Sequence, residues 1–392
     1  MSEMTSNLTL QYNVDGIPMY HKAKYNLWPI HCMINELPPS KRKENIMMCG
    51  LWFGSSKPVF KTYLKPFVEE LKVLCEKGLS WKNNGKIFSS RVIPILCTAD
   101  APARAMLQNF NQYNGKFSCG FCENEGERIE RGRGHSRVYK VSNPLPAKRT
   151  FGTSVEYAEI AVNMDKPVKG VKGSSLLMKL YPYFDMVEGF VPDYMHSVLL
   201  GVTRQFVNLR LSTSDEAYCL KKRDVSEVND RINNLKEPSE VTRKLHSFGD
   251  VIHWKASEWR IFLLTSPVLL LNVLNPTTYN HWILLVHAIT ILLGTNIKSS
   301  DLQTAESAIQ KFVTGVTEIY GEGELTYNVH LLLHLPDKVK SWGPLCASSC
   351  FAYEDALGKL KNFHQGTKGV PMQILFAYLK KNIASNISVR RH

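Results

Sequence analysis

The chain has 392 residues and a mass of 44.6 kDa, and 44% of its residues are hydrophobic, which is enough to fill one large core or two modest ones. This composition excludes a disordered chain. The formal net charge of +13 is large for a soluble protein and favours a polyanionic partner, with nucleic acid first. A basic surface that serves only solubility is the alternative.

Nine cysteines, an odd number spread over a long chain, do not make a disulfide framework, and the first ten residues lack the features of a signal peptide. We therefore expect an intracellular, reducing location. The most apolar stretch, residues 261–294, is interrupted by Asn272, Asn275 and Pro276. No uninterrupted run reaches membrane-spanning length, so we expect no membrane partner.

The first 110 residues alternate between strand and helix patterns. Segments rich in β-formers and separated by turn residues predict three strands, at 9–14, 25–34 and 45–54. Helical spacing then predicts a helix over 57–78, which ends at Gly78. A nearly continuous apolar run at 91–100 predicts a buried strand, and a helix with Pro102 in its first turn follows over 101–110.

Two acids stand at the ends of these strands. Asp15 follows the first strand and Asp100 ends the fourth. Asp15 precedes Gly16, and an Asp-Gly pair is common in turns that have no chemical role. However, three strands, a helix, a fourth strand and a helix are the order of a ribonuclease-H-like core, in which the first and fourth strands are neighbours. In that fold the two carboxylates would share one metal pair.

A second set of residues has the composition of a zinc site. Cys119 and Cys122 have C-x-x-C spacing, which is also typical of redox pairs, and zinc needs four ligands. His330 and His334 share one face if their segment is helical, although histidines at this spacing also occur in ordinary packing. Together the two pairs complete a Cys2His2 set that would tie the first half of the chain to the last.

Between these pairs lies a long segment that we expect to be a mostly helical insertion. The division is a first core part at 1–122, an insertion at 123–325 and a final part at 326–392. The Gly-rich residues 168–175 lack the spacing of a nucleotide phosphate loop. A helix begins near Asp193 and His196, which lie one turn apart.

The third acid is expected after this insertion, as Glu354 in a helix over 348–364. Phe351 and Leu357 lie three residues either side of Glu354, so Glu354 belongs to the inward stripe of the helix. The adjacent Asp355 then points toward Lys359, four residues on, as a surface pair. A surface position for Glu354 is the alternative.

Eight blocks of the sequence together resemble the transposases of the CACTA (En/Spm, tnp2-like) group, in the animal form. The blocks occur in the same order and cover nearly the whole chain: VDGIPMYHKAKYNLWPI, GLWFGSSKP, LCTADAPARA, GKFSCGFC, GVKGSSLL, DYMHSVLLGV, NVHLLLHLPDKVKSWGPL and FAYEDALGKL. The resemblance implies a DDE-type enzyme with a ribonuclease-H-like fold that cuts and joins DNA at element ends. Its three acids correspond to Asp15, Asp100 and Glu354, with Mg²⁺ or Mn²⁺ as cofactor.

The chain also resembles, more distantly, the catalytic subunit of the V(D)J recombinase, which has a similar layout. There, a C-x-x-C after the second acid and a histidine pair before the Glu bind zinc. This layout corresponds here to the four zinc candidates Cys119, Cys122, His330 and His334. Three further residues could compete as ligands, namely Cys346, Cys350 and His196.

Three classes of function remain open. The first is an active DNA transposase or endonuclease, the second a domesticated DNA-binding or scaffold protein without catalysis, and the third a zinc-stabilised protein with no nucleic-acid role. All three acids favour the first class, and the +13 charge argues against the third. No zinc-finger or helix-turn-helix pattern precedes Asp15, so an N-terminal module that binds DNA ends is expected to be missing. We expect a nuclear location, DNA as partner, and a homodimer or larger homo-oligomer.

Overall fold

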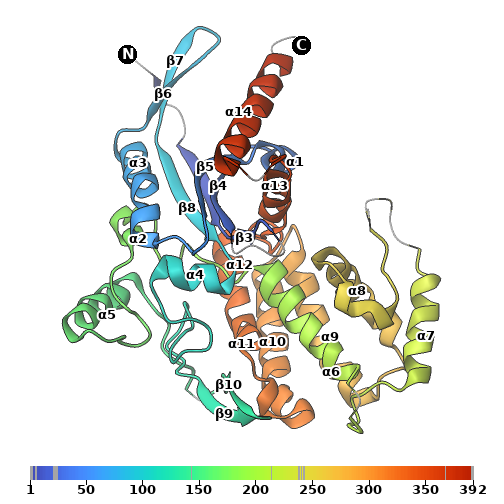
Figure 1. Cartoon of the computed structure of the whole chain (residues 1–392). Coiled ribbons are helices and arrows are strands. Elements are labelled where there is room, and N and C mark those ends of the chain that lie inside the picture. The colour runs from blue at the N-terminus through green and yellow to red at the C-terminus, as the bar shows by residue number, and fades with distance from the viewer. Residues whose placement is uncertain are drawn as a thin grey trace.

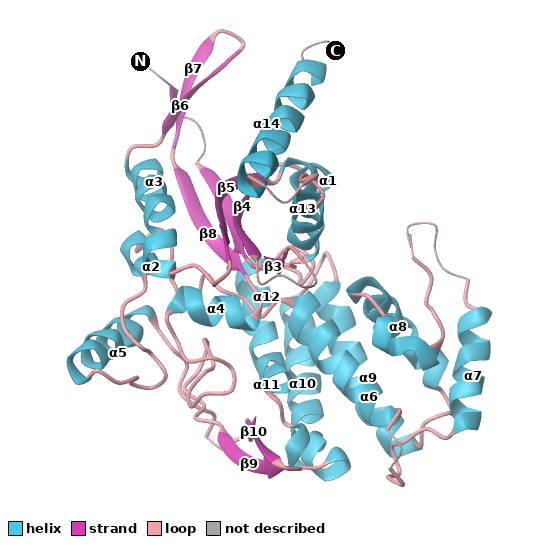
Figure 2. Ribbon diagram, in the orientation of Figure 1, coloured by secondary structure: helices cyan, strands magenta, loops and turns pink. Residues whose placement is uncertain are grey.

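The computed structural model describes residues 3–4, 7–20, 25–142, 144–212, 214–236, 239, 241, 243–366 and 368–389. It is a mixed α/β structure in which strands dominate the first quarter of the chain and helices the rest (Figures 1 and 2). The strands are β1 Glu3–Met4, β2 Leu8–Val14, β3 Ile17–Pro18, β4 Asn26–Ile34, β5 Met47–Gly54, β6 Leu79–Asn83, β7 Lys86–Ser90, β8 Val92–Thr98, β9 Glu127–Arg131 and β10 Gly134–Val138.

The helices fall into α-helices and shorter or irregular turns. The α-helices are α1 Pro39–Arg42, α2 Phe60–Tyr63, α3 Lys65–Glu76, α4 Ala101–Gln108, α5 Phe151–Met164, α6 Arg204–Arg210, α7 Lys222–Asn233, α8 Ala256–Leu270, α9 Pro276–Leu293, α10 Ser299–Tyr320, α11 Tyr327–Leu331, α12 Leu335–Trp342, α13 Phe351–Lys361 and α14 Val370–Val389. The others are the 3-10 turns η1 Lys43–Asn45, η2 Leu176–Leu180, η4 Phe248–His253, η5 Glu322–Glu324 and η6 Leu332–His334, and the π-helix η3 Tyr194–Thr203.

The central sheet has the order β5–β4–β2–β8, and β3 extends β2 along the same edge of β4. Strands β2 and β4 are antiparallel, whereas β2 and β8 are parallel, with Tyr12 opposite Cys97. The prediction that the first and fourth predicted strands are neighbours is therefore confirmed. Because parallel strands end at the same edge of a sheet, the residues that follow β2 and β8 come together there.

Two features of this region differ from the sequence prediction. The predicted helix over 57–78 is divided into α2 and α3, because Pro66 lies in the first turn of α3 and lacks the N–H that a continuous helix needs. The sequence analysis also does not predict the hairpin β6–β7. This hairpin lies between α3 and β8 in the chain and projects from the end of the sheet (Figure 1). Its turn at Asn84 and Gly85 has positive φ angles of 47° and 81°.

Side chains of β2 alternate between the two faces of the sheet, as the pleat requires. On one face Tyr12 packs between Phe67 of α3 and Phe184, with ring centroids 5.6 and 5.5 Å away. On the other face lie Gln11 and Asn13, beneath α13. Asp15 continues the alternation on this second face, which points its carboxylate toward α13.

The rest of the chain forms a second core below the sheet in Figure 1, built mainly from α8, α9 and α10. Three fully buried side chains lie within it, Phe262, Trp282 and Phe312. By contrast, α5 and η2 contribute Ala158 and Leu177 to the core of the sheet. Among the described residues, no helix has both the length and the apolar character needed to cross a bilayer.

Candidate metal centres

Two of the three predicted acids, Asp15 and Glu354, meet although they come from distant parts of the sequence. Asp15 follows β2, Asp100 follows β8, and Glu354 lies in the first turn of α13. Ligand atoms of Asp15, Glu354 and His196 lie within 4.8 Å of one another. Asp100 is outside this tight group, but its charge acts on Asp15. The arrangement brings together residues that are more than 300 positions apart.

The position of Asp15 depends on its neighbour. Asp15 is 8% exposed, and its Oδ1 accepts a hydrogen bond of 2.6 Å from the Gly16 N–H. A Cβ at position 16 would lie 2.1 Å from Trp28 Cε2, so only glycine fits against this buried indole. The glycine of the Asp-Gly pair is therefore required by close packing beside the carboxylate.

Asp100 has a structural contact of its own. Its Oδ1 accepts a hydrogen bond of 2.7 Å from the Ala103 N–H and caps the N-terminus of α4. Such a cap is worth about 1 kcal/mol to a helix. Because a carboxylate has two oxygens, one can hold the helix while the other is available to a cation.

The electrostatics of this group differ from those of exposed acids. Burial, followed by the charges of Asp100 and Glu354, raises the pKa of Asp15 to about 8. Burial also raises the pKa of Glu354, although His196 and a hydrogen bond with Asp15 act in the opposite direction. Without a bound cation, the protonated form of Asp15 is therefore favoured over a wider pH range than in an exposed aspartate. Carboxylates that repel one another in this way favour a bound divalent cation.

His196 supplies positive charge to the same group. Its Nδ1 lies 2.8 Å from Asp193 Oδ2, and its Nε2 lies 3.7 Å from Glu354 Oε1. Burial alone would lower the pKa of His196, but the hydrogen bond and charge of Asp193, with Asp100 and Asp15, raise it to about 9. These contacts favour the protonated form of His196. The sequence makes His196 a competing zinc ligand, but in the structure it lies beside the acids.

The orientation predicted for α13 is confirmed. Glu354 points toward Asp15 and His196, while Asp355 is exposed and forms an ion pair of 2.5 Å with Lys359. Leu357 is 1% exposed, on the inward stripe of the helix.

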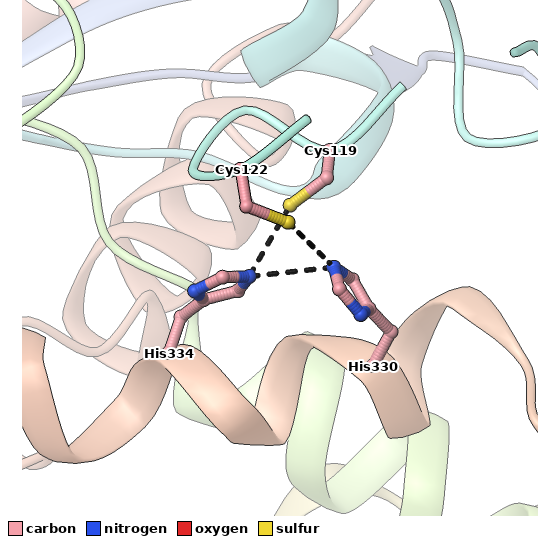
Figure 3. Close-up of side chains that lie close together, drawn as sticks. All are labelled: Cys119, Cys122, His330 and His334. Atoms are coloured by element: carbon pink, nitrogen blue, oxygen red, sulfur yellow. Dashed lines mark hydrogen bonds between the residues drawn. The ribbon is translucent and has the colours of Figure 1, made fainter. Parts of the chain in front are cut away.

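The four zinc candidates form a second cluster. Figure 3 shows Cys119 and Cys122 on a loop that faces His330 and His334 on the helical segment below. Cys119 Sγ is 3.4 Å from His334 Nε2, Cys122 Sγ is 3.3 Å from His330 Nε2, and the two Nε2 atoms are 3.3 Å apart. The segment is helical as the prediction required, with the 3-10 turn η6 between α11 and α12. Both imidazoles face the thiols.

These separations match the requirements of zinc. Tetrahedral zinc with Zn–S bonds of about 2.3 Å and Zn–N bonds of about 2.0–2.1 Å places sulfur and nitrogen about 3.6 Å apart and two nitrogens about 3.3 Å apart. Both cysteines and His330 are buried. Burial alone would raise the pKa of Cys119, but its hydrogen bond with Cys122 and the two imidazoles lower it, while the pKa of Cys122 is raised. A cation is needed before both thiols ionise, so the donor set fits zinc.

Arg149 holds the cysteine loop in place, and no sequence pattern predicted it. The side chain is 2% exposed, and its Nε donates a hydrogen bond of 2.7 Å to the Cys119 carbonyl. Its Nη2 donates to the carbonyls of Phe117 and Lys169. An isolated arginine gives no signal in the sequence, because its partners are backbone carbonyls supplied by the fold.

The remaining competing ligands are not part of the zinc cluster. Cys350 is buried beside Asp193 and His196, and Asn13 Nδ2 lies 3.8 Å from its Sγ. Cys346 is exposed. The described residues thus give the Cys2His2 set no third thiol within 4.8 Å.

Comparison with protein families gives one match. Residues 1–158 match the model described as transposase family tnp2. This segment includes Asp15, Asp100 and the C-x-x-C pair but ends before the two histidines and Glu354. A search of curated proteins finds no match. The match covers 158 of the 392 residues, so it shows that the first part of the chain is similar to this transposase family.

Proposed function

We propose that this protein is a DDE-type DNA transposase that carries out metal-dependent strand cleavage and strand transfer at transposon ends. The observation that carries the proposal is the meeting of Asp15, after β2, with Glu354, from α13, beside the end of β8. Burial and the neighbouring acids disfavour the ionised form of Asp15 in the metal-free fold, and a bound divalent cation would offset this cost.

We also propose that the sheet is a ribonuclease-H-like core. The order β5–β4–β2–β8, with β2 and β8 parallel and an acid after each, supports this assignment. The proposed division is a first core part at 1–122, a mostly helical insertion at 123–325, and residues 326–392 as the end of the core. Members of the CACTA group and, more distantly, the V(D)J recombinase catalytic subunit are the proposed relatives.

The acids would act by holding Mg²⁺ or Mn²⁺. Asp15, Asp100 and Glu354 offer the hard oxygen ligands that these ions prefer. When bound, such ions activate the attacking oxygen and stabilise the leaving oxygen at phosphorus. In the metal-free chain a hydrogen bond joins Asp15 and Glu354, and binding a divalent cation would displace its proton. His196, when protonated, would place a positive charge beside these acids, where a DNA phosphate would approach them.

The cysteine and histidine cluster would hold one structural zinc ion. Such an ion would join the loop after α4 to the segment that begins at α11, and so fix the last part of the chain on the first. Structural zinc of this kind contributes directly to folding stability. The protein would work in the nucleus, on DNA, as a homodimer or a larger homo-oligomer.

A nicking assay tests the catalytic proposal. Supercoiled plasmid is incubated with the purified chain and Mg²⁺ or Mn²⁺, and the conversion to open circles is followed over time. Wild-type protein should nick the plasmid, whereas Asp100→Asn and Glu354→Gln should not. Asp355→Asn is the matched control, because it makes the same kind of change one position away on the exposed side of α13.

The variants also separate catalysis from the alternative of a domesticated DNA-binding protein. Wild type that binds DNA but never nicks it, under conditions in which zinc content and folding are normal, would replace the enzyme proposal with that alternative. Nicking that survives Glu354→Gln but not Asp355→Asn would show that the third acid has been assigned wrongly.

A further inference from the structure

The carboxylate of Asp193 joins three backbone and side-chain groups in the interior. Asp193 is 2% exposed and lies at the N-cap of η3. Its Oδ2 accepts hydrogen bonds of 2.8 Å from the His196 N–H and from His196 Nδ1. Its Oδ1 accepts a hydrogen bond of 2.8 Å from the N–H of Cys350, which is far away in the sequence.

The bond to Cys350 fixes the helix that carries Glu354. Cys350 is the N-cap residue of α13, and its side chain does not cap that helix. Instead, the Asp193 carboxylate, which comes from another segment, accepts a hydrogen bond from the backbone N–H of Cys350 at this end of the helix. The Cys350 carbonyl in turn accepts a hydrogen bond of 2.9 Å from the Glu354 N–H. A continuous chain of two hydrogen bonds therefore runs from Asp193 to the backbone of Glu354.

The bonds to His196 fix the ring that faces the acids. An imidazole nitrogen bonded to a carboxylate acts as donor, so Asp193 assigns the Nδ1 proton and directs Nε2 toward Glu354. Asp193, His196 and Cys350 also have donor atoms within 4.8 Å of one another. This group is a poor metal site, because both Asp193 oxygens already accept N–H bonds.

We propose that Asp193 is a positioning residue, which sets the place of Glu354 and the orientation of His196 at the acid cluster. The inference rests on the proposed function, in which those acids hold a divalent cation. It also gives the helical insertion a direct part in the catalytic centre, since Asp193 and His196 both come from that segment. Partners of this kind, one layer outside the ligands, typically change metal affinity by about 10–100-fold when they are removed.

The test measures Mn²⁺ binding by the zinc-loaded chain, from the loss of the free-ion signal in electron paramagnetic resonance. Asp193→Asn keeps the size of the side chain but replaces one acceptor oxygen with an NH₂ donor, and Asp193→Ala removes both oxygens. We expect Mn²⁺ affinity to fall at least tenfold in both variants, while zinc content stays at the wild-type value.

Asp185→Asn is the matched control. Asp185 Oδ1 likewise accepts backbone hydrogen bonds, from Val187 and Glu188, in the segment just before Asp193. This variant should lose some stability and keep its Mn²⁺ affinity. Wild-type Mn²⁺ affinity in a folded Asp193→Asn protein would overturn the proposal, because a merely structural role changes stability alone.

Hydrogen–deuterium exchange gives a readout that needs no metal. In peptides covering residues 350–356, exchange should be faster in both Asp193 variants than in wild type or in Asp185→Asn. If wild type binds no Mn²⁺, the proposed function fails, and exchange alone then decides whether Asp193 holds α13. If exchange in residues 350–356 were the same in the Asp193 variants as in wild type, the proposal that Asp193 fixes the start of α13 would be overturned as well.

Discussion

Replacing Asp15 by asparagine should stabilise the chain in the absence of Mg²⁺, and more so as the pH rises. Asparagine has nearly the same shape as aspartate, and its side-chain oxygen can still accept the hydrogen bond from the Gly16 N–H. What the substitution removes is a carboxyl group whose ionisation is disfavoured by burial and by the charges of Asp100 and Glu354. The expected gain therefore comes from electrostatics, with packing largely preserved.

The size and sign of this change in stability follow from the pKa of Asp15. The ordinary value for Asp15 is 3.8, and in the folded chain burial and the neighbouring acids raise the pKa to about 8. Between these values the folded chain holds a proton that the unfolded chain has released. The associated stability is fully present below pH of about 4 and is lost as the pH rises to about 8, at about 1.4 kcal/mol per pH unit. The Asp15→Asn variant has no such loss. Its free energy of unfolding relative to wild type should therefore increase by about 2 kcal/mol between pH 6 and pH 8.

Urea unfolding of zinc-loaded protein at pH 6 and pH 8, without added Mg²⁺ or Mn²⁺, measures this difference. Adding millimolar Mg²⁺ at pH 8 should then stabilise wild type and leave Asp15→Asn unchanged, because only the carboxylate cluster binds the ion. Asp355→Asn, on the exposed side of α13, is the control for a general effect of charge. A difference between wild type and Asp15→Asn that is the same at both pH values would refute the reasoning.

Three further predictions concern zinc, DNA and packing. Cys119→Ser should remove about one zinc ion per chain and lower the melting temperature, as metal analysis and thermal unfolding would show, whereas Cys346→Ser, at an exposed thiol, should change neither. DNA affinity measured by fluorescence anisotropy should fall steeply with salt and depend little on sequence, given the +13 charge; a flat salt response would contradict a phosphate-facing surface. Leu357→Ala should cost about 2–4 kcal/mol of unfolding free energy by leaving a cavity, while Leu379→Ala, 44% exposed, should change it by less than about 0.5 kcal/mol.

The sequence predicts those parts of the fold in which apolar residues recur at the regular spacing of a strand or a helix. The β-former runs at 9–14 and 91–100 correspond to β2 and β8, and the apolar spacing around Glu354 gave the correct inward face of α13. In each case the pattern is local, because burial on one face repeats every second residue in a strand and every three or four in a helix. The hairpin β6–β7 lacks such a period, since most of its side chains are exposed or half-buried.

The candidate sites depended on contacts that no local pattern encodes. His196 was recognised only as a spare zinc ligand, because its place beside Glu354 follows from the packing of η3 against α13. The roles of Asp193 and Arg149 likewise depend on backbone groups of Cys350 and Cys119 that folding brings to them. Spacing identified the chemistry of these residue types, but only the tertiary structure shows which side chains serve which centre.

The acid cluster and the cysteine–histidine cluster are joined mechanically through α4. Asp100 caps the first turn of this helix, and Arg104, one turn on and 2% exposed, donates hydrogen bonds to the Val191 carbonyl and to the Tyr327 hydroxyl. Tyr327 begins α11, which carries His330, and Val191 precedes Asp193 by two residues. The same buried guanidinium therefore holds the second acid's helix, the histidine segment and the segment that positions Glu354. If the two clusters hold zinc and a divalent cation as proposed, a disturbance at the cysteine–histidine cluster would be transmitted along these bonds to the acids.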